Sequence, residues 1–215
     1  MHLEITMDNL QLAQIERLFY GSDEDEFVTL PREAPYCVVP PPTNESPILY
    51  CTKASFVLSC LDQLGISPFA EIGLVGRYGL PQPSDADWLG QMLEHRAVGF
   101  LGDLDAVDLL IFAWLGRQFP TARITYLGLG DDLLSAAGIA LAESSNLDQV
   151  ASPEEQQQQS FVRTLLPELG SLIGQASDQK MKSGRKLELP AVFCQQVPDP
   201  EGFARFVGTW HARLR

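Results

Sequence analysis

The sequence lacks any long hydrophobic run. Its densest apolar stretch, residues 109–115, is far shorter than the roughly 18 residues that a membrane-spanning helix requires, so we expect no membrane association. The N-terminus has neither a basic region nor a following apolar stretch, which argues against a signal peptide. Together these absences predict a cytoplasmic protein.

Cysteine and positive charge are also scarce. The four cysteines form no C-x-x-C pair and have no histidine at zinc-ligand spacing, so we expect reduced thiols rather than disulfides or a zinc site. The chain carries 15 Lys and Arg residues against 28 Asp and Glu residues, a net charge of −13. Such a charge argues against a protein that coats nucleic acid without sequence preference, because neutralising phosphates requires clustered basic side chains.

The basic residues that do occur are unevenly distributed. Residues 160–215 carry eight basic and five acidic residues, whereas residues 1–159 carry seven and twenty-three. One interpretation is a solvated acidic surface; the other is a local basic strip that binds nucleic acid weakly. The strip consists of Lys180, Lys182, Arg185 and Lys186. Arg77, in a glycine-flanked loop, is a further candidate phosphate contact, with an ordinary surface-loop position as the alternative.

What the sequence does contain is a regular alternation of strand-like and helix-like segments. The apolar strand-like runs are residues 48–51, 72–75, 97–101 and 123–127. The helical segments between and after them are residues 56–64, 84–92, 109–119 and 132–143. This order predicts an α/β fold with a four-stranded, mainly parallel sheet flanked by helices. In the helices, Trp88 and Trp114 fall on apolar faces and are expected in the core, as is Trp210.

Three regions are expected along the chain. Residues 1–45 form a short strand–helix segment, and the prolines at 40–42 mark its end. Residues 46–195 form the α/β domain, which includes one or two helices over residues 161–182. A further helix is expected after Ser152, which would be its N-cap, with Pro153 as the first helical residue and Glu155 at the third position. Residues 196–215 form a helical C-terminal extension.

Two aspartates stand where ligands bind in parallel sheets, just beyond the carboxyl end of a strand. Asp103 and Asp105 follow the run 97–101 and, in extended chain, would lie roughly 6–7 Å apart on one side. Carboxylates at that spacing suit Mg²⁺. The alternative is that they are turn and N-cap residues. Asp108, one helical step further, is expected to face solvent.

The segment from Ala97 to Ile111 resembles the D-x-D-x-x-G segment of Toprim domains, in which a hydrophobic strand ends in two aspartates and a helix begins at once. The similarity is to topoisomerase VI A subunits and Wadjet-type nuclease subunits, and extends in order and pattern over residues 46–195. The stretch from Lys180 to Ala191 also resembles a segment of those proteins. The resemblance implies a Toprim-like fold with Asp103 and Asp105 as metal ligands and catalytic groups.

The sequence departs from the pattern of this family at more than one position. A Toprim site needs a glutamate at the end of its first strand, and here that place falls on Cys51 or Thr52. Glu45 and Glu71 do not replace it convincingly, and Asp108 stands where the motif has glycine. We therefore expect weak Mg²⁺ binding without cleavage.

The resulting hypothesis is a non-catalytic interaction or structural subunit with a protein partner or a second copy of itself. The alternative is a Mg²⁺-dependent enzyme that cleaves phosphodiester bonds in nucleic acid through Asp103 and Asp105. A lesser alternative is a haloacid-dehalogenase-like phosphatase, because Asp103-Leu104-Asp105-Ala106-Val107 matches its nucleophile segment and Gly130-Asp131-Asp132 imitates its later acidic motif.

Overall fold

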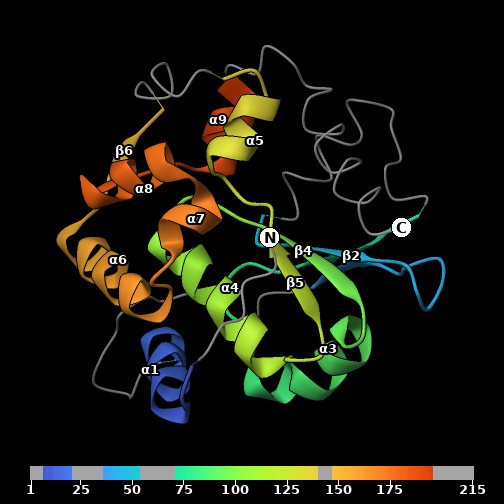
Figure 1. Ribbon diagram of the computed structural model, residues 1–215. Helices are drawn as coiled ribbons and strands as arrows, with labels where there is room; N and C mark the ends of the chain where they lie inside the picture. Colours follow the sequence, from blue (N-terminus) through green and yellow to red (C-terminus); the bar gives the residue numbers. More distant parts are fainter. Residues whose placement is uncertain (1–6, 21–35, 54–70, 140–146, 196–215) are drawn as a thin grey trace.

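A five-stranded sheet forms the centre of the molecule (Figure 1). The structure, a computed structural model, describes residues 7–20, 36–53, 71–139 and 147–195. The strands are β1 (Cys37–Val39), β2 (Ile48–Cys51), β3 (Gly73–Gly76), β4 (Ala97–Leu101) and β5 (Arg123–Tyr126). They lie in the order β1-β3-β2-β4-β5, and all neighbours are parallel except β1, which is antiparallel to β3.

Helices flank this sheet, and a second, small sheet lies beside it. The described helices are α1 (Asn9–Tyr20), α3 (Ala86–Leu93), α4 (Ala106–Gln118), α5 (Asp131–Ala136), α6 (Pro153–Leu165), α7 (Leu169–Ile173), α8 (Gln175–Lys182) and α9 (Leu189–Gln195). The small sheet pairs β6 (Gln149–Val150) with β7 (Arg185–Lys186). In Figure 1, α6, α7 and α8 gather on one side of α4, while the strands lie on its other side.

The predicted α/β alternation is confirmed, because parallel strands occur at all four expected places. The expected number of strands is wrong, since β1 adds a fifth at the edge. β1 has only three residues, half-buried or exposed, and is followed directly by proline, so it lacks the length of a recognisable strand. The expected strand at residues 3–5 and the helices at 56–64 and 200–214 lie outside the described residues, as does Trp210.

Helix α4 is buried on every side. Seven consecutive residues, 109–115, have almost no exposed surface, which is why this stretch is apolar all round rather than amphipathic. α4 lies between the sheet and α6 and also contacts α1. Trp114 is in the core as expected, and its indole N–H donates to Glu16 of α1 at 3.1 Å. The N-terminal segment thus contributes both α1 and β1 to the packing of the α/β domain.

The helix starts agree with the sequence at one place and differ at another. Ser152 caps α6 with a full capping box, as predicted. α3 begins at Ala86 rather than at residue 84, because a 3-10 turn (Pro83–Asp85, η2) precedes it and Asp85 accepts a hydrogen bond from the backbone of Gln82. Trp88 is 37% exposed rather than in the core. It lies at the rim, its ring centroid 4.8 Å from that of Tyr36.

The second half of the domain has more elements than expected. Residues 161–182 fall in three helices, α6, α7 and α8, instead of one or two. Among the described residues, Cys37 and Cys51 are free thiols. Within the described residues, no helix has the length and apolar character needed to span a bilayer.

Two glycines provide a test of the packing. A Cβ on Gly130 would lie 2.6 Å from the carbonyl oxygen of Ile173, a backbone atom that cannot easily move. A Cβ on Gly90, inside α3, would meet nothing closer than 3.7 Å. We expect Gly130→Ala to destabilise the fold by about 1–3 kcal/mol through overpacking. Gly90→Ala should stabilise it by about 0.5–1 kcal/mol, because alanine has the higher helix propensity.

Urea denaturation of the two variants and the wild type measures both changes in the free energy of unfolding. A Gly130→Ala protein as stable as the wild type would contradict the close approach of α7 to the start of α5.

Candidate functional site

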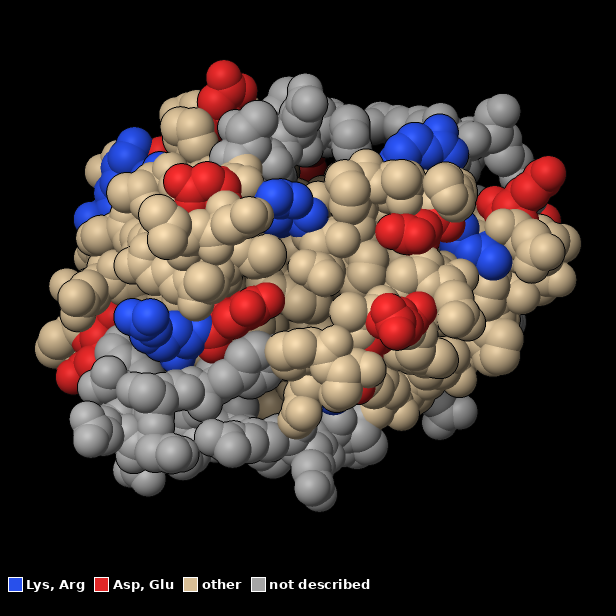
Figure 2. Space-filling view, turned by 90° about the horizontal axis from the view of Figure 1, so that it is seen from below, with Lys and Arg blue, Asp and Glu red and all other residues tan. Residues whose placement is uncertain are grey.

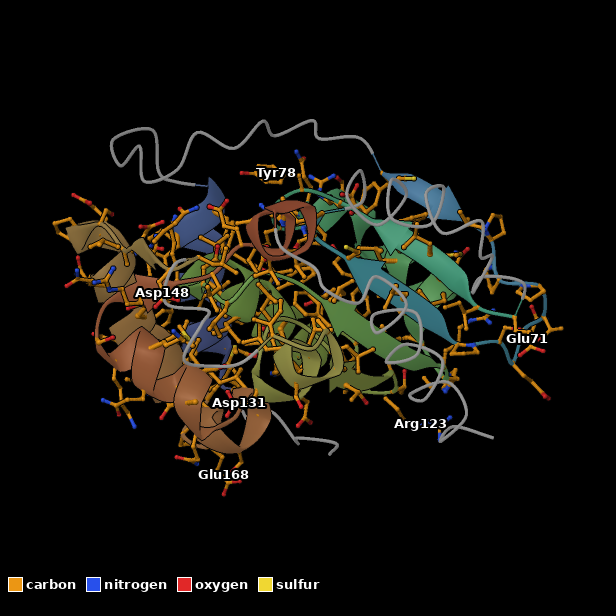
Figure 3. The ribbon with its side chains drawn as sticks, turned by 90° about the horizontal axis from the view of Figure 1, so that it is seen from above. Glu71, Tyr78, Arg123, Asp131, Asp148 and Glu168 are labelled. Atoms are coloured by element: carbon orange, nitrogen blue, oxygen red, sulfur yellow. The ribbon has the colours of Figure 1, made fainter. Side chains whose placement is uncertain are left out.

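The candidate site lies at the carboxyl edge of the parallel strands. β2 leads into Thr52 and Lys53, β3 leads into Arg77 and Tyr78, and β4 leads into Asp103. Because these strands are parallel neighbours, their carboxyl ends meet at one edge. Figure 3 shows Tyr78 well separated from Glu71, as expected for residues that follow and precede the same strand.

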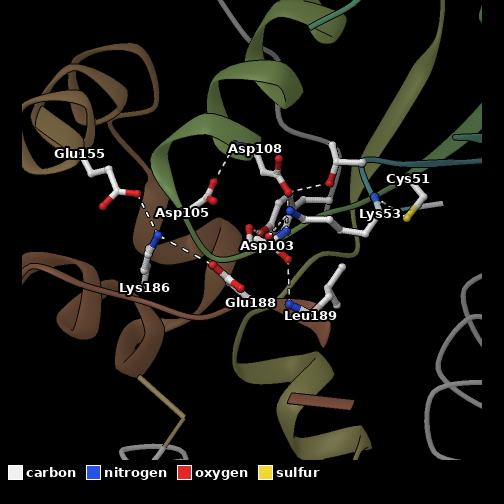
Figure 4. A network of polar contacts seen from close by, with 11 residues as sticks. Cys51, Lys53, Asp103, Asp105, Asp108, Glu155, Lys186, Glu188 and Leu189 are labelled. Atoms are coloured by element: carbon white, nitrogen blue, oxygen red, sulfur yellow. Dashed lines mark hydrogen bonds and ion pairs between the residues drawn. The ribbon is translucent and has the colours of Figure 1, made fainter. Parts of the chain in front are cut away.

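Asp103 is the central carboxylate of this edge and is only 1% exposed. Its Oδ1 accepts a hydrogen bond from the backbone N–H of Leu189 at 2.7 Å, and its Oδ2 lies 3.1 Å from Nζ of Lys53 (Figure 4). Burial raises the pKa of Asp103, whereas the Lys53 charge and the Leu189 N–H oppose that rise. Asp103 is therefore held by two groups from distant parts of the chain.

Asp108 is buried rather than facing solvent, so the expectation for this residue is wrong. It is 4% exposed, and one of its oxygens, Oδ2, accepts hydrogen bonds from the Thr52 hydroxyl and the Asp103 backbone N–H, both at 2.6 Å. Burial and the nearby charges of Asp105 and Asp103 raise its pKa well above the usual range. The missed signal is the apolar run at 109–115: a helix that is apolar all round is buried on every side, and Asp108 lies directly before this run.

Asp105 is the N-cap of α4. Its Oδ1 accepts a hydrogen bond from the Asp108 backbone N–H at 2.7 Å, which matches the N-cap alternative considered from the sequence. Burial, and secondly the charge of Asp103, raise the pKa of Asp105 to about 6. The structure thus brings Asp103 and Asp105 together electrostatically, while each carboxylate has its own backbone donor.

Glu188 is a fourth acidic residue at this edge and was not foreseen. The backbones of Leu187 and Leu104 donate hydrogen bonds to each other, and this pairing places Glu188 near Asp103. The negative charge of Glu188 raises the pKa of Asp103 further. Lys186 lies 2.8 Å from Oε1 of Glu155 and 3.8 Å from Oε1 of Glu188 (Figure 4). The pairing of residues 104 and 187 is a long-range contact with no local sequence signal, so sequence reasoning could not find it.

The other candidate acids do not complete a metal site. Cys51 and Thr52 stand at the end of β2, and burial raises the pKa of the Cys51 thiol. Asp131 accepts hydrogen bonds from the N–H groups of Ala176 and Ser177 at the start of α8. Glu45 and Glu71 are exposed. In the described part of the chain, no three His, Cys, Asp or Glu residues are arranged to hold a metal ion.

Most of the candidate nucleic-acid contacts are engaged with other groups of the protein. Arg77 is not a surface-loop residue: it is 5% exposed, donates to the Leu80 carbonyl at 3.2 Å and lies over the Tyr36 ring. In the basic strip, each of the three lysines is ion-paired. The pairs are Lys180–Asp148, Lys182–Asp178 and Lys186–Glu155, at 2.6–2.8 Å.

Arg185 of the same strip is exposed. On the face shown in Figure 2, basic side chains occur singly or in small groups among acidic and neutral ones rather than as one continuous patch.

The chain matches no protein-family model, and no curated protein matches it.

The role of Asp108 can be tested by substitution. Asp108→Ala removes the acceptor for the Thr52 hydroxyl and the Asp103 N–H and leaves both donors buried without it. We expect a loss of about 2–4 kcal/mol in the free energy of unfolding. Asp108→Asn keeps a carbonyl oxygen as acceptor and should lose less than about 1 kcal/mol. Equal losses in the two variants, measured by urea denaturation, would show that the carboxylate's charge rather than its acceptor role stabilises the fold.

Asp105 makes stability depend on pH with an unusual sign. Its pKa of about 6 in the folded protein lies above the value of an unfolded aspartate, so between about pH 4 and 6 the folded state binds more protons. The contribution of Asp105 to stability is thus full below about pH 4 and is lost as the pH rises through 6. Asp105→Asn keeps an N-cap side chain and removes this loss.

We expect the stability of Asp105→Asn, relative to the wild type, to increase by on the order of 1 kcal/mol between pH 4 and pH 7. Urea denaturation of both proteins at the two pH values provides the measurement. If the two proteins differ in their free energy of unfolding by the same amount at both pH values, the pKa of Asp105 is not raised.

Proposed function

We propose that this chain is a non-catalytic, Toprim-like protein that acts as a structural or protein-binding subunit. The observation that carries the proposal is the internal use of the edge carboxylates. Asp103 binds the Leu189 N–H and pairs with Lys53, Asp105 caps α4, and Asp108 joins Thr52 to Asp103. Carboxylates held in this way stabilise the fold, whereas a nuclease needs them free for metal ions.

The end of β2 gives the second argument. Two-metal cleavage of a phosphodiester clamps both the attacking and the leaving oxygen, which usually needs acidic ligands in addition to two aspartates. Here β2 ends in a buried thiol and a hydroxyl that donates to Asp108. Asp103 and Asp105 alone would hold one hydrated Mg²⁺ weakly, because the ion must compete with Lys53 for Asp103.

The surface charge favours a protein partner over nucleic acid. The net charge of −13 repels phosphates at a distance, and three of the four basic-strip residues are already neutralised by carboxylates. We therefore propose a protein partner or a second copy of this chain, with weak nucleic-acid binding at most.

One observation favours the alternative of a Mg²⁺-dependent phosphodiester-cleaving enzyme. Glu188, about one-third exposed, lies close enough to Asp103 to affect its pKa, and it could supply the acidic ligand that β2 lacks. The lesser alternative, a haloacid-dehalogenase-like phosphatase, would need a free Asp103 carboxylate as nucleophile. The contacts of Asp103 with Lys53 and Leu189 argue against that role.

A nuclease assay in Mn²⁺ separates these functions. We expect no cleavage of single- or double-stranded DNA by the wild type, because the edge carboxylates are engaged and β2 supplies no acid. The assay includes Asp103→Asn/Asp105→Asn as the matched control and Cys51→Glu as a variant that restores a carboxylate at the end of β2.

Wild-type cleavage that disappears in the double variant would establish the enzymatic alternative instead. Cleavage gained by Cys51→Glu alone, and lost again when Asp103 is also replaced, would support both the present inactivity and the Toprim-like origin.

A further inference from the structure

Lys53 lies where the three central strand ends converge. It follows β2 by two residues, its Nζ is 3.1 Å from Oδ2 of Asp103 at the end of β4, and the same Nζ lies 4.8 Å from the centre of the Tyr78 ring after β3. The Lys53 side chain is 23% exposed, whereas Asp103 is almost fully buried. The ammonium group therefore stands between the carboxylate and the surface.

The charges at this edge are unbalanced without Lys53. Asp103, Asp105, Asp108 and Glu188 are acidic, and burying even one carboxylate is unfavourable unless a cation or several donors compensate it. Lys186 is closer to Glu155 than to Glu188. Among the residues that the structure describes, Lys53 is thus the cation in direct contact with Asp103.

Oδ2 of Asp103 has incomplete interactions. Among the described residues, no donor meets this buried oxygen with hydrogen-bond geometry, although the Lys53 ammonium lies 3.1 Å away. Oδ1, in contrast, has the Leu189 N–H at 2.7 Å. Oδ2 of Asp103 is therefore compensated by the Lys53 ammonium, and its position is where a different cation could bind if the lysine were removed.

We propose that Lys53 is the resident cation of this carboxylate cluster and keeps divalent metal ions out, so that its removal opens a metal site on Asp103. The inference rests on the proposed non-catalytic function and names what makes the site inactive. An ammonium ion satisfies the charge of Asp103 but cannot polarise a phosphate or activate water as a divalent ion does. The opposite charges of Asp103 and Asp108 outweigh the burial of Lys53 and raise its pKa above the usual range, so the lysine stays charged.

The experiment compares Mn²⁺ binding by the wild type and by Lys53→Met, which has similar length and no charge. Free Mn²⁺ is measured by electron paramagnetic resonance during a titration of the full chain. We expect Lys53→Met to bind one Mn²⁺ at least about tenfold more tightly than the wild type, because the ion no longer displaces a charge-assisted contact. Adding Asp103→Asn to Lys53→Met should abolish the gain.

Lys186→Met is the matched control. It removes the same charge from the same edge of the sheet but not from Asp103, so its affinity for Mn²⁺ should change less than about threefold. An equal gain in Lys186→Met would show that net charge rather than the position of Lys53 governs metal binding, and would overturn the proposal. An unchanged affinity in Lys53→Met would overturn it as well.

Folding is followed by circular dichroism in the same samples. If Lys53→Met folds only when Mn²⁺ is present, the ion replaces the lysine and the proposal stands, because a ligand of the native state stabilises it. If the variant stays unfolded with and without Mn²⁺, a divalent ion cannot take the place of Lys53 and the proposal fails. DNA cleavage by the wild type would refute the non-catalytic function, whereas the role of Lys53 is decided separately by the Mn²⁺ affinities of the wild type and Lys53→Met.

Discussion

One buried oxygen, Oδ2 of Asp108, joins three elements of the fold at the carboxyl edge of the sheet. It accepts hydrogen bonds from the hydroxyl at the end of β2 and from the backbone at the end of β4, while the residue itself lies in the first turn of α4. Two strands and the central helix are thereby fixed to one another at one point. Since unsatisfied buried donors are costly, these groups hold their positions together or not at all. The positions of Asp103 and Asp105 on either side follow from this arrangement.

Much of the fold could be predicted because its signals are local. Each parallel strand is a short apolar run, and a capping box marks the start of α6. What could not be predicted depends on partners distant in sequence. β1 is a strand because its backbone pairs with the edge of β3. Arg77 is buried against the Tyr36 ring and beside the Asp85 carboxylate. A sequence pattern describes a residue's neighbours along the chain but not those across the fold.

The candidate site illustrates the same limit in more detail. The place of Asp103 at the end of a strand was predictable, as was the absence of an acid at the end of β2. The ion pair of Asp103 with Lys53 was not, because a lone lysine after a strand usually lies in solvent. The approach of Glu188 depends on the pairing of Leu104 with Leu187. The acidic pattern alone therefore predicts a metal site. The lysine and the hydrogen-bond donors around these carboxylates argue instead for carboxylates that are already engaged within the protein.

The hydrogen bond from Leu189 to Asp103 also has a consequence for the order of folding. It joins residues 86 positions apart, so it closes a long loop, and the entropy of that closure must be met before the contact can form. The parallel strands β2, β4 and β5 can pair earlier, through connections of shorter range. During synthesis, the acidic edge of the sheet therefore emerges well before residues 187–189 that cover it. Until those residues arrive, Oδ1 of Asp103 lacks its backbone donor, so this carboxylate gains its second partner only after residues 187–189 have been made.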